Sequence, residues 1–354
     1  NEVMILLVIS SLARIFTSVP GDLIVHTGQA AWLSVFLGLG VAFLQLWLIW
    51  QILKNHPGQN LIEATENIAG AGFGTFFNVL WLALIMSVNV LYVRIFSEDL
   101  LLSTLFSTPL LVILVIFVIS SVWAVFLGIG ALARGAKLLA PFILGGMLFL
   151  VLCLFPLFNF NNLFPLLGEG LDKIVLWGAL EGSVVIEVIL GAVMLKSLAK
   201  PEILPKAAIR ALFIGFGVFT ILEIALLLAI HWRSSAEFIL PFYSLSRQIH
   251  LGRFFQRVES LFLIIWLFIV LIKSAFLLYC SVLTWADTLK LPDYRPLIAP
   301  VALVTLMFSL CPSDFSTTMQ YSADYMRRYF WILGFGIPIV LVIWDKLKQR
   351  SRLQ

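Results

Sequence analysis

The chain has 354 residues, of which 61% are hydrophobic and only 12% are charged. A soluble domain carries roughly 25% charged residues, so this composition excludes one. The net charge of +4 could suggest nucleic acid, but the basic residues lie in short loops between apolar runs and form no dense stripe beside aromatic residues. We therefore predict a multi-pass membrane protein that contacts a lipid bilayer and binds no nucleic acid.

Apolar runs long enough to cross a bilayer predict an all-α protein with ten membrane-spanning helices. They cover about residues 3–25, 30–53, 74–97, 109–130, 137–157, 174–195, 207–230, 258–282, 297–311 and 329–344. An even number of spans puts both termini on one side. If that side is the cytoplasm, the inner loops carry more Lys and Arg than the outer loops, as the positive-inside rule requires. We predict one transmembrane domain over residues 1–354.

The first span carries Arg14 near its middle, the hydroxyls of Thr17 and Ser18, and then Pro20. Proline removes an intrahelical hydrogen bond and disfavours helix in the residue before it, which predicts an interruption around residues 16–19. Arg14 could bind a ligand carboxylate with two parallel hydrogen bonds, pair with Glu181 or Glu187 as a structural lock, or reach for a membrane interface. These interpretations remain open at this point.

The third span contains Asn89, Arg94 and Glu98. Arg94 and Glu98 are i,i+4 neighbours, so the spacing favours a local ion pair. Asn89 lies deeper in the span and is a candidate polar wall of a cavity.

The sixth span, residues 174–196, has two acids near its middle, Glu181 and Glu187. An acid there costs about 2.5–3.5 kcal/mol on insertion scales and usually faces a cavity or a partner. On a regular helix the two acids lie roughly 120° apart, so an unbroken helix cannot aim both at one small site. Gly182 and the β-branched run that follows predict a break near Gly182. The alternative is a continuous helix whose acids bond to neighbouring helices.

Interruptions in the first and sixth of ten spans are typical of a five-plus-five inverted repeat, in which two broken helices form the substrate site of a transporter. This pattern predicts that the first and sixth spans meet at a common site.

The eighth span carries Glu259 and Lys273, which lie on one helix face about 21 Å apart and cannot pair with each other. Lys273 is expected to pair with another acid, for which Glu223 in the seventh span is a candidate, to lose its proton, or to line water. It could also replace a sodium ion in a cation site or reach the inner interface. We consider Glu259 and Lys273 candidate cation-site or gating residues. Between the seventh and eighth spans, ILPFYSLSRQI has the apolar spacing of a helix lying on the outer surface.

No catalytic triad, phosphate-binding glycine loop or metal-ligand spacing is present in the sequence. We therefore expect no enzyme activity, no metal and no cofactor.

Several stretches together resemble one family. They are TGQAAWLS at Thr27–Ser34, LFNFNNLFPLLGEGL before the sixth span, VVIEVIL within it, QRVESLFLIIWLF opening the eighth, and FSLCPSDFSTTMQYSADY after the ninth. Their joint order, over about residues 10–345, resembles the B subunit of spore germination receptors, a family of the amino acid-polyamine-organocation (APC) transporter superfamily.

The resemblance implies ten helices of the APC type, with the first and sixth unwound around a small-molecule site. It also implies a receptor complex with an integral-membrane A subunit and a lipoprotein C subunit, in the inner membrane of a spore-forming bacterium. The ligand contacts it carries over fall at residues 13–18 and 183–187. Where many relatives have Gly-x-Gly in the first span, this chain has Ala13-Arg14-Ile15, and Val185 replaces a glycine before the acid. Arg14 is therefore the candidate for holding a ligand carboxylate.

The predicted function is a nutrient germinant-sensing subunit that binds a small molecule, an amino acid, at mid-membrane and signals to partner subunits. The alternative is a proton- or sodium-coupled amino acid transporter, and a third is an ion-conducting or scaffold protein with a vestigial site. The candidate substrate-binding residues are Arg14, Phe16, Thr17, Ser18, Asn89, Glu181, Gly182, Ser183, Val184 and Glu187.

Overall fold

The computed structural model describes residues 2–198, 200–249 and 258–353, and every regular element in these ranges is helical. The α-helices are α1 (Glu2–Leu12), α2 (Val19–Thr27), α3 (Ala31–Asn55), α4 (Leu61–Ser103), α5 (Leu110–Phe126), α6 (Ile129–Leu154), α7 (Leu171–Ser183), α8 (Ile186–Val193), α9 (Leu204–Ala229), α10 (Trp232–Ser235), α11 (Pro241–Ser246), α12 (Val258–Thr288), α13 (Ile298–Ser309), α14 (Phe315–Gln320) and α15 (Arg327–Leu353). Short 3-10 turns join several of them, and a π-helical turn, η8 (Tyr321–Met326), precedes α15.

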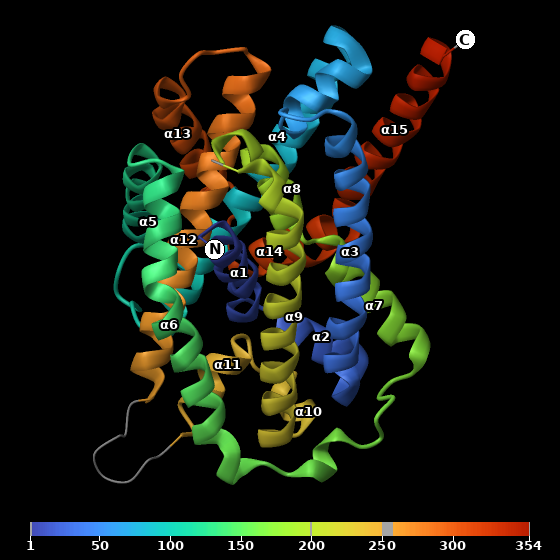
Figure 1. Cartoon of the computed structure of the whole chain (residues 1–354). Helices are drawn as coiled ribbons and strands as arrows, with labels where there is room; N and C mark the ends of the chain where they lie inside the picture. Colours follow the sequence, from blue (N-terminus) through green and yellow to red (C-terminus); the bar gives the residue numbers. More distant parts are fainter. Residues whose placement is uncertain (1, 199, 250–257, 354) are drawn as a thin grey trace.

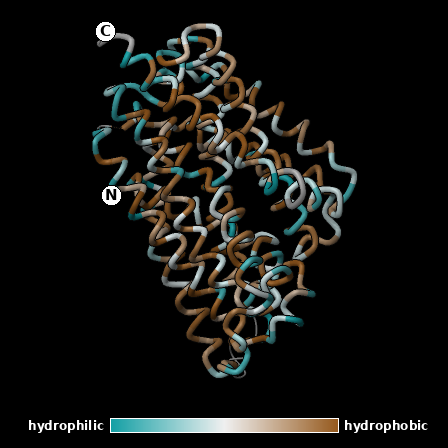
Figure 2. Tube along the Cα trace, turned by 90° about the vertical axis from the view of Figure 1, so that its right-hand side faces the viewer, coloured by the Kyte–Doolittle hydropathy of each residue, from teal (hydrophilic) through white to brown (hydrophobic). Residues whose placement is uncertain are grey.

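Seven helical segments among the described residues are long and apolar enough to cross a membrane, and two shorter apolar helices, Leu110–Phe126 and Arg295–Ser309, accompany them. Hydrophobic residues follow the helices along their length, while hydrophilic residues gather mainly in loops and near the C-terminus (Figure 2). The chain is therefore a membrane protein built as a helical bundle. The long helices run roughly along one direction, with α10 and α11 at the end opposite the C-terminus (Figure 1).

The first predicted span is broken, as expected. α1 ends at Leu12, a 3-10 turn η1 (Ala13–Phe16) follows, and Thr17 is extended at φ −111° and ψ −171° before α2 begins. Thr17 satisfies backbone groups that the break releases, because its hydroxyl donates to Arg14 O at 2.7 Å and accepts from Val19 N at 3.3 Å. Pro20 stands in the first turn of α2, where its missing N–H costs no intrahelical bond.

The sixth predicted span is also broken near Gly182, as expected. α7 continues through Ser183, and the helical conformation is lost at Val185, with φ −78° and ψ 86°, before α8 begins. The break falls two to three residues after the glycine, within the β-branched run. The β-branched residues, which support helix weakly, mark the break better than the glycine does.

Gly182 instead allows α7 to approach α3 closely. A Cβ on Gly182 would lie 2.2 Å from Gly38 O, and one on Gly178 would lie 2.8 Å from Ser34 O. The two helices therefore meet backbone to backbone along a line of small residues. This contact fixes α7 against α3 just before the break.

α12 packs against α1, α4, α5 and α6 and passes beside η1 and α8. Lys273 lies near the middle of this helix, where it pairs with Glu187 of α8. The segment predicted to form a helix on the outer surface contains α11. Its residues Phe242, Leu245 and Ser246 are buried, and the helix packs on η1, α9 and α12. The apolar face of α11 therefore covers the first helix break, while its contact with the membrane interface stays a prediction.

Candidate functional site

Arg14 joins the two broken helices. Its Nη1 donates to Glu181 Oε1 at 3.1 Å, and its Nη2 donates to Glu187 Oε2 at 3.2 Å. Glu181 precedes the second break and Glu187 follows it, so the break lets one guanidinium bind two acids that a regular helix would point apart. All three side chains are buried, with 7% exposure for Arg14 and 3% for each acid.

A second cation completes the cluster. Lys273 of α12 forms an ion pair with Glu187 Oε1, to which the Ser10 hydroxyl also donates at 3.1 Å. Glu187 thus receives hydrogen bonds from three residues on three segments. The partner of Lys273 is Glu187, and the predicted pairing with Glu223 is wrong. Lys273 is 1% exposed, so it does not reach the interface either.

Aromatic rings and a backbone carbonyl support the two cations. Arg14 Cζ lies 5.0 Å from the centre of the Phe216 ring, and Lys273 Nζ lies 5.1 Å from that of Tyr92. Arg14 Nε donates to Ser11 O at 3.2 Å, a carbonyl near the end of α1. A buried charge is tolerated only when it is paired and hydrogen-bonded. The ion pairs with the two acids meet this requirement for Arg14 and Lys273, and the aromatic rings add favourable contacts.

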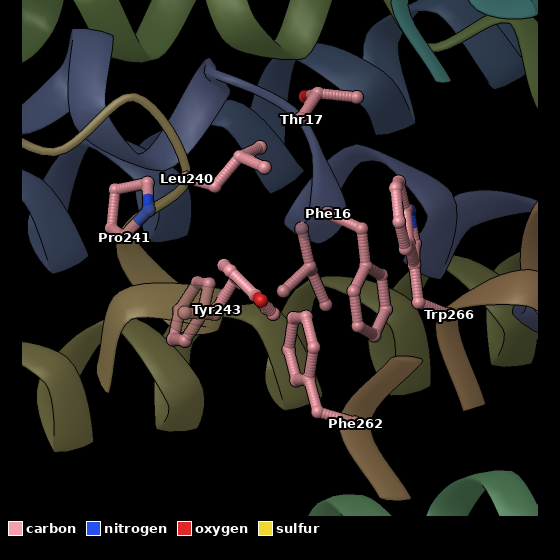
Figure 3. A pocket seen from close by; sticks show the side chains of 9 residues that line it. Phe16, Thr17, Leu240, Pro241, Tyr243, Phe262 and Trp266 are labelled. Carbon is pink, nitrogen blue, oxygen red and sulfur yellow. The ribbon is translucent and has the colours of Figure 1, made fainter. Parts of the chain in front are cut away.

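Aromatic side chains cover η1 on the side of α11. The rings of Phe16 and Phe262 are 5.1 Å apart, and that of Tyr243 is 6.2 Å from Phe262. With Trp266 they enclose a cavity of about 10 Å³, and their rings crowd around it (Figure 3). A single water needs about 10–15 Å³, so this side of η1 is closed to any nutrient-sized molecule.

A second set of contacts joins the two broken spans to α15. Arg327 Nη2 donates to Asp22 Oδ2 of α2 at 3.1 Å, and its guanidinium lies 5.6 Å from the ring centre of Trp177 in α7. The imidazole ring of His26 in α2 stacks on the same Trp177 ring, with 3.8 Å between the ring centroids. These contacts therefore hold α2, α7 and α15 together.

The remaining predicted site residues lie at different distances from the charged cluster of Arg14, Glu181, Glu187 and Lys273. Thr17 lines the small cavity, whereas the Ser18 hydroxyl donates to Asp22 at 3.3 Å. Ser183 Oγ donates to Leu180 O at 2.7 Å, and Val184 N to Glu181 O at 3.3 Å, so both residues close the end of α7. Gly182 faces α3.

Asn89 and Glu259 are not brought to the cluster. The Asn89 amide is directed to α13, where it donates to Thr305 Oγ1 at 3.4 Å. Glu259 lies partly exposed in the first turn of α12, about 21 Å along the helix from Lys273. The predicted ion pair between Arg94 and Glu98 is confirmed at 2.7 Å.

Sequence reasoning missed Ser10, Phe216, Trp266 and the covering role of α11. Ser10 lies four residues before Arg14 and shares its helix face, which is a usable signal for a polar contact. The aromatic residues give no signal of this kind, because the chain has 30 Phe and 11 Trp residues, most of them unrelated to the site.

The comparisons with known proteins agree with this arrangement. A model of the spore germination protein family matches residues 1–317. The chain belongs to this family. It is a family of permease-like membrane proteins, as the resemblance of the sequence indicated.

Three relatives of this spore germination protein come from Bacillus subtilis (strain 168). It is 24% identical to spore germination protein YndE over 332 residues, which are 90% of this chain and 88% of the relative. It is 22% identical to spore germination protein KB over 99% of this chain and 96% of the relative. It is 26% identical to spore germination protein A2 over 90% of this chain and 87% of the relative.

Among solved structures, the spore germination protein is similar to Mhp1, a nucleobase-cation-symport-1 family transporter, in a closed conformation with bromovinylhydantoin bound. The TM-score is 0.68 at 15% identity, over 96% of this chain and 77% of the transporter. It is also similar to a manganese transporter of Eremococcus coleocola, with a TM-score of 0.54 at 15% identity, over 96% of this chain and 75% of that one. The fold is therefore that of APC-type transporters.

Proposed function

We propose that this protein is the nutrient-sensing subunit of a spore germination receptor and that it binds an amino acid between its two helix breaks. The observation that carries the proposal is the bridge from Arg14 to Glu181 and Glu187. These three charges meet where the backbone of two spans is interrupted, and interrupted spans form the substrate sites of many transporters.

The charges of the site suit a zwitterion. A guanidinium binds a carboxylate with two parallel hydrogen bonds, and a buried carboxylate binds an ammonium group. In the closed arrangement Arg14 is held by Glu181 and Glu187. An amino acid would exchange these internal contacts for its own, with its carboxylate on Arg14. The substrate-binding set is then Arg14, Phe16, Thr17, Glu181, Ser183, Val184 and Glu187, while Ser18, Asn89, Gly182 and Glu259 would act on it indirectly.

The finer architecture is part of the same proposal. We infer ten spans in one transmembrane domain, arranged as a five-plus-five inverted repeat with both termini on the cytoplasmic side of the inner membrane. The helix breaks in the first and sixth spans support this arrangement, and so does the distribution of Lys and Arg over the loops. The proposed partners are an integral-membrane A subunit and a lipoprotein C subunit.

Signalling requires two conformations that the ligand distinguishes, because a ligand shifts an equilibrium only by its differential affinity. The closed cover of Phe16, Tyr243, Phe262 and Trp266 would have to open to admit the amino acid. The tie between Asp22 and Arg327 would loosen in the same step, since it holds α2 to α15. Partner subunits in contact with α2 and α11 would respond to the resulting movement of these helices.

The proposal is tested by thermal-shift measurements on the purified protein in detergent with the common amino acids, nucleosides and sugars. An amino acid should raise the transition temperature of the parent protein and not of Arg14→Ala. Arg94→Ala is the matched control, since it also removes a buried, paired arginine but lies away from the breaks. A shift that survives in Arg14→Ala would exclude Arg14 as a ligand contact and support its role as a lock.

The alternative function, a proton- or sodium-coupled amino acid transporter, is favoured by the buried Lys273, which could stand where such transporters bind a cation. Uptake of the bound amino acid into liposomes separates the two functions. Concentrative uptake driven by a proton or sodium gradient would establish the transporter. Binding without uptake would establish the sensor.

A further inference from the structure

Glu223 of α9 is a buried acid that the contacts described above do not use. It is 0% exposed, and neither of its carboxyl oxygens has a hydrogen-bond donor among the residues that the structure describes. An ionised carboxylate is strongly disfavoured in such a place, because it has lost its water without gaining a partner. Glu223 therefore has to be neutral or to have a cationic partner.

Its charged neighbour is Glu181, the same acid that binds Arg14. Glu223 also lies seven residues after Phe216, two turns along the same face of α9, and Phe216 packs against Arg14. Together with Glu187 and Lys273 the region then holds three acids and two cations. The charges balance only if one acid carries a proton, and Glu223 is the one without a hydrogen-bond donor.

The other charged groups near α9 do not supply the missing partner. α9 packs against α1, α3, α6, α8, α10 and α11. In these helices Glu187 is engaged with Arg14 and Lys273, and Tyr243 donates to Ser103 O at 2.9 Å. The other titratable residues of these helices are Glu2, Lys54, Arg134, Lys137, Cys153 and Arg233, and α9 itself carries Lys206 and Arg210 in its first two turns, far from Glu223. None of these described residues forms a hydrogen bond with Glu223.

We propose that Glu223 holds a proton in this conformation and that Glu223 and Glu181 together accept the ammonium group of the bound amino acid. This inference rests on the proposed function. The bound zwitterion adds no net charge to the three acids and two cations, so Glu223 keeps its proton, and its carbonyl oxygen accepts from the ammonium group beside the Glu181 carboxylate. The ligand carboxylate takes the Arg14 hydrogen bonds that Glu181 gives up.

The chemistry around the charges narrows the ligand class. Phe216 packs on the Arg14 guanidinium, and Val184 lies in the chain between Glu181 and Glu187, so both offer apolar surface near the charged groups. An amino acid with a small apolar side chain fits these surroundings. L-Alanine, L-valine and L-leucine are therefore the probes, with propionate, isovalerate and 4-methylpentanoate as matched acids that lack the ammonium group.

The proton on Glu223 is tested without a ligand by infrared spectroscopy of the parent protein at neutral pH. A neutral carboxylic acid has a C=O stretch that a carboxylate lacks, and Glu223→Gln should remove one such band. Asp99→Asn is the control, because Asp99 is also buried with no donor to either oxygen among the described residues, but it lies beside Glu98. It should remove a different band. A spectrum unchanged by Glu223→Gln would overturn the protonated state.

Because Gln resembles a neutral Glu in shape, Glu223→Gln should fold with a transition temperature close to that of the parent. A large loss of thermal stability in this variant, with Asp99→Asn unaffected, would mean that Glu223 is ionised and would overturn the inference.

The ammonium site is tested by calorimetric titration with the three amino acids in two buffers of different ionisation enthalpy. Parent protein and Asp99→Asn should bind with the same enthalpy in both buffers, because no proton is released or taken up. Glu223→Leu, which removes the carbonyl oxygen, should bind at least tenfold more weakly, Glu223→Gln, which keeps one, should bind as the parent does, and the matched acids should not distinguish these variants. Proton release on binding, or unchanged affinity in Glu223→Leu, would overturn this inference alone. If none of the three binds the parent, the proposed function fails for this ligand class, and the ammonium site fails with it.

Discussion

Two buried arginines in this protein, Arg14 and Arg94, are bound in opposite ways. Arg94 pairs with Glu98 at 2.7 Å within the regular part of α4 that follows a kink at Gly70, and its Nη1 donates to Ser309 O at 3.0 Å. Arg14 stands on a 3-10 turn and binds two acids from other segments, which flank a second helix break. The first pair is local and its backbone is continuous. The Arg14 contacts join residues that are far apart in the sequence, at the two helix breaks.

The difference indicates different roles. The Arg94 pair stabilises α4 against α13 and α14, and Thr318 of α14 adds a hydrogen bond to Glu98 at 3.3 Å. It can be broken only at the expense of folding. The Arg14 contacts join elements that have no continuous helix between them, so a ligand with matching charges could replace them. The following predictions test this contrast, from the largest expected effect to the smallest.

Removing either guanidinium should destabilise the protein by about 3–5 kcal/mol, because each leaves a buried carboxylate without its partner. Arg14→Ala and Arg94→Ala should therefore both lower the transition temperature in detergent. Only Arg14→Ala should abolish amino acid binding in the same preparation. Equal loss of binding in both variants would show that the two regions do not differ in function.

Lys273→Met should have a smaller effect on stability, about 2 kcal/mol, since Glu187 keeps its hydrogen bonds from Arg14 and Ser10. The variant should still fold and should bind amino acids with altered affinity, because the charge balance of the cluster changes by one. Thermal unfolding and calorimetric titration measure the two effects. A complete loss of folded protein would mean that Lys273 is a structural lock comparable to Arg94.

Gly182→Ala tests whether the glycine beside the second break acts through packing. The added Cβ would meet Gly38 O at 2.2 Å and Val41 Cβ at 2.7 Å, so α3 and α7 have to separate, at a cost of about 1–3 kcal/mol.

Gly40→Ala is the matched control on α3, where a Cβ meets no atom within 4 Å. It should leave the transition temperature unchanged or raise it slightly, because Ala favours helix over Gly. A benign Gly182→Ala would contradict the close approach of the two helices.

The smallest effect is expected at Asp314, which caps α14 and so positions Thr318 near Glu98. Its side chain accepts from Thr317 N at 2.8 Å, and this hydrogen bond holds the pKa of the Asp314 carboxyl below its ordinary value. A lowered pKa adds stability above the ordinary pKa of an aspartate, and this stability is lost as the pH falls through the lowered value. The parent should lose slightly more stability than Asp314→Asn in unfolding experiments between neutral pH and pH 3. Identical pH profiles would contradict the cap.

The sequence by itself determined those features that depend on composition and on local spacing. Apolar runs specified membrane helices, Pro20 specified the first break, and the i,i+4 spacing specified the Arg94 pair. The physical reason is that these features arise within one or two turns of a helix. The likeness to the family was also carried by short stretches in a constant order.

The tertiary structure decided what depends on the meeting of distant segments. Arg14 had several open interpretations, and only the tertiary structure brought Glu181 and Glu187 to it while pairing Lys273 with Glu187. The break falls near Gly182, as predicted, but only the packing shows that Gly182 itself stays helical and lies against α3. Glu223 lost its predicted partner in the same way, since no local pattern reports which of several buried acids a distant lysine will reach.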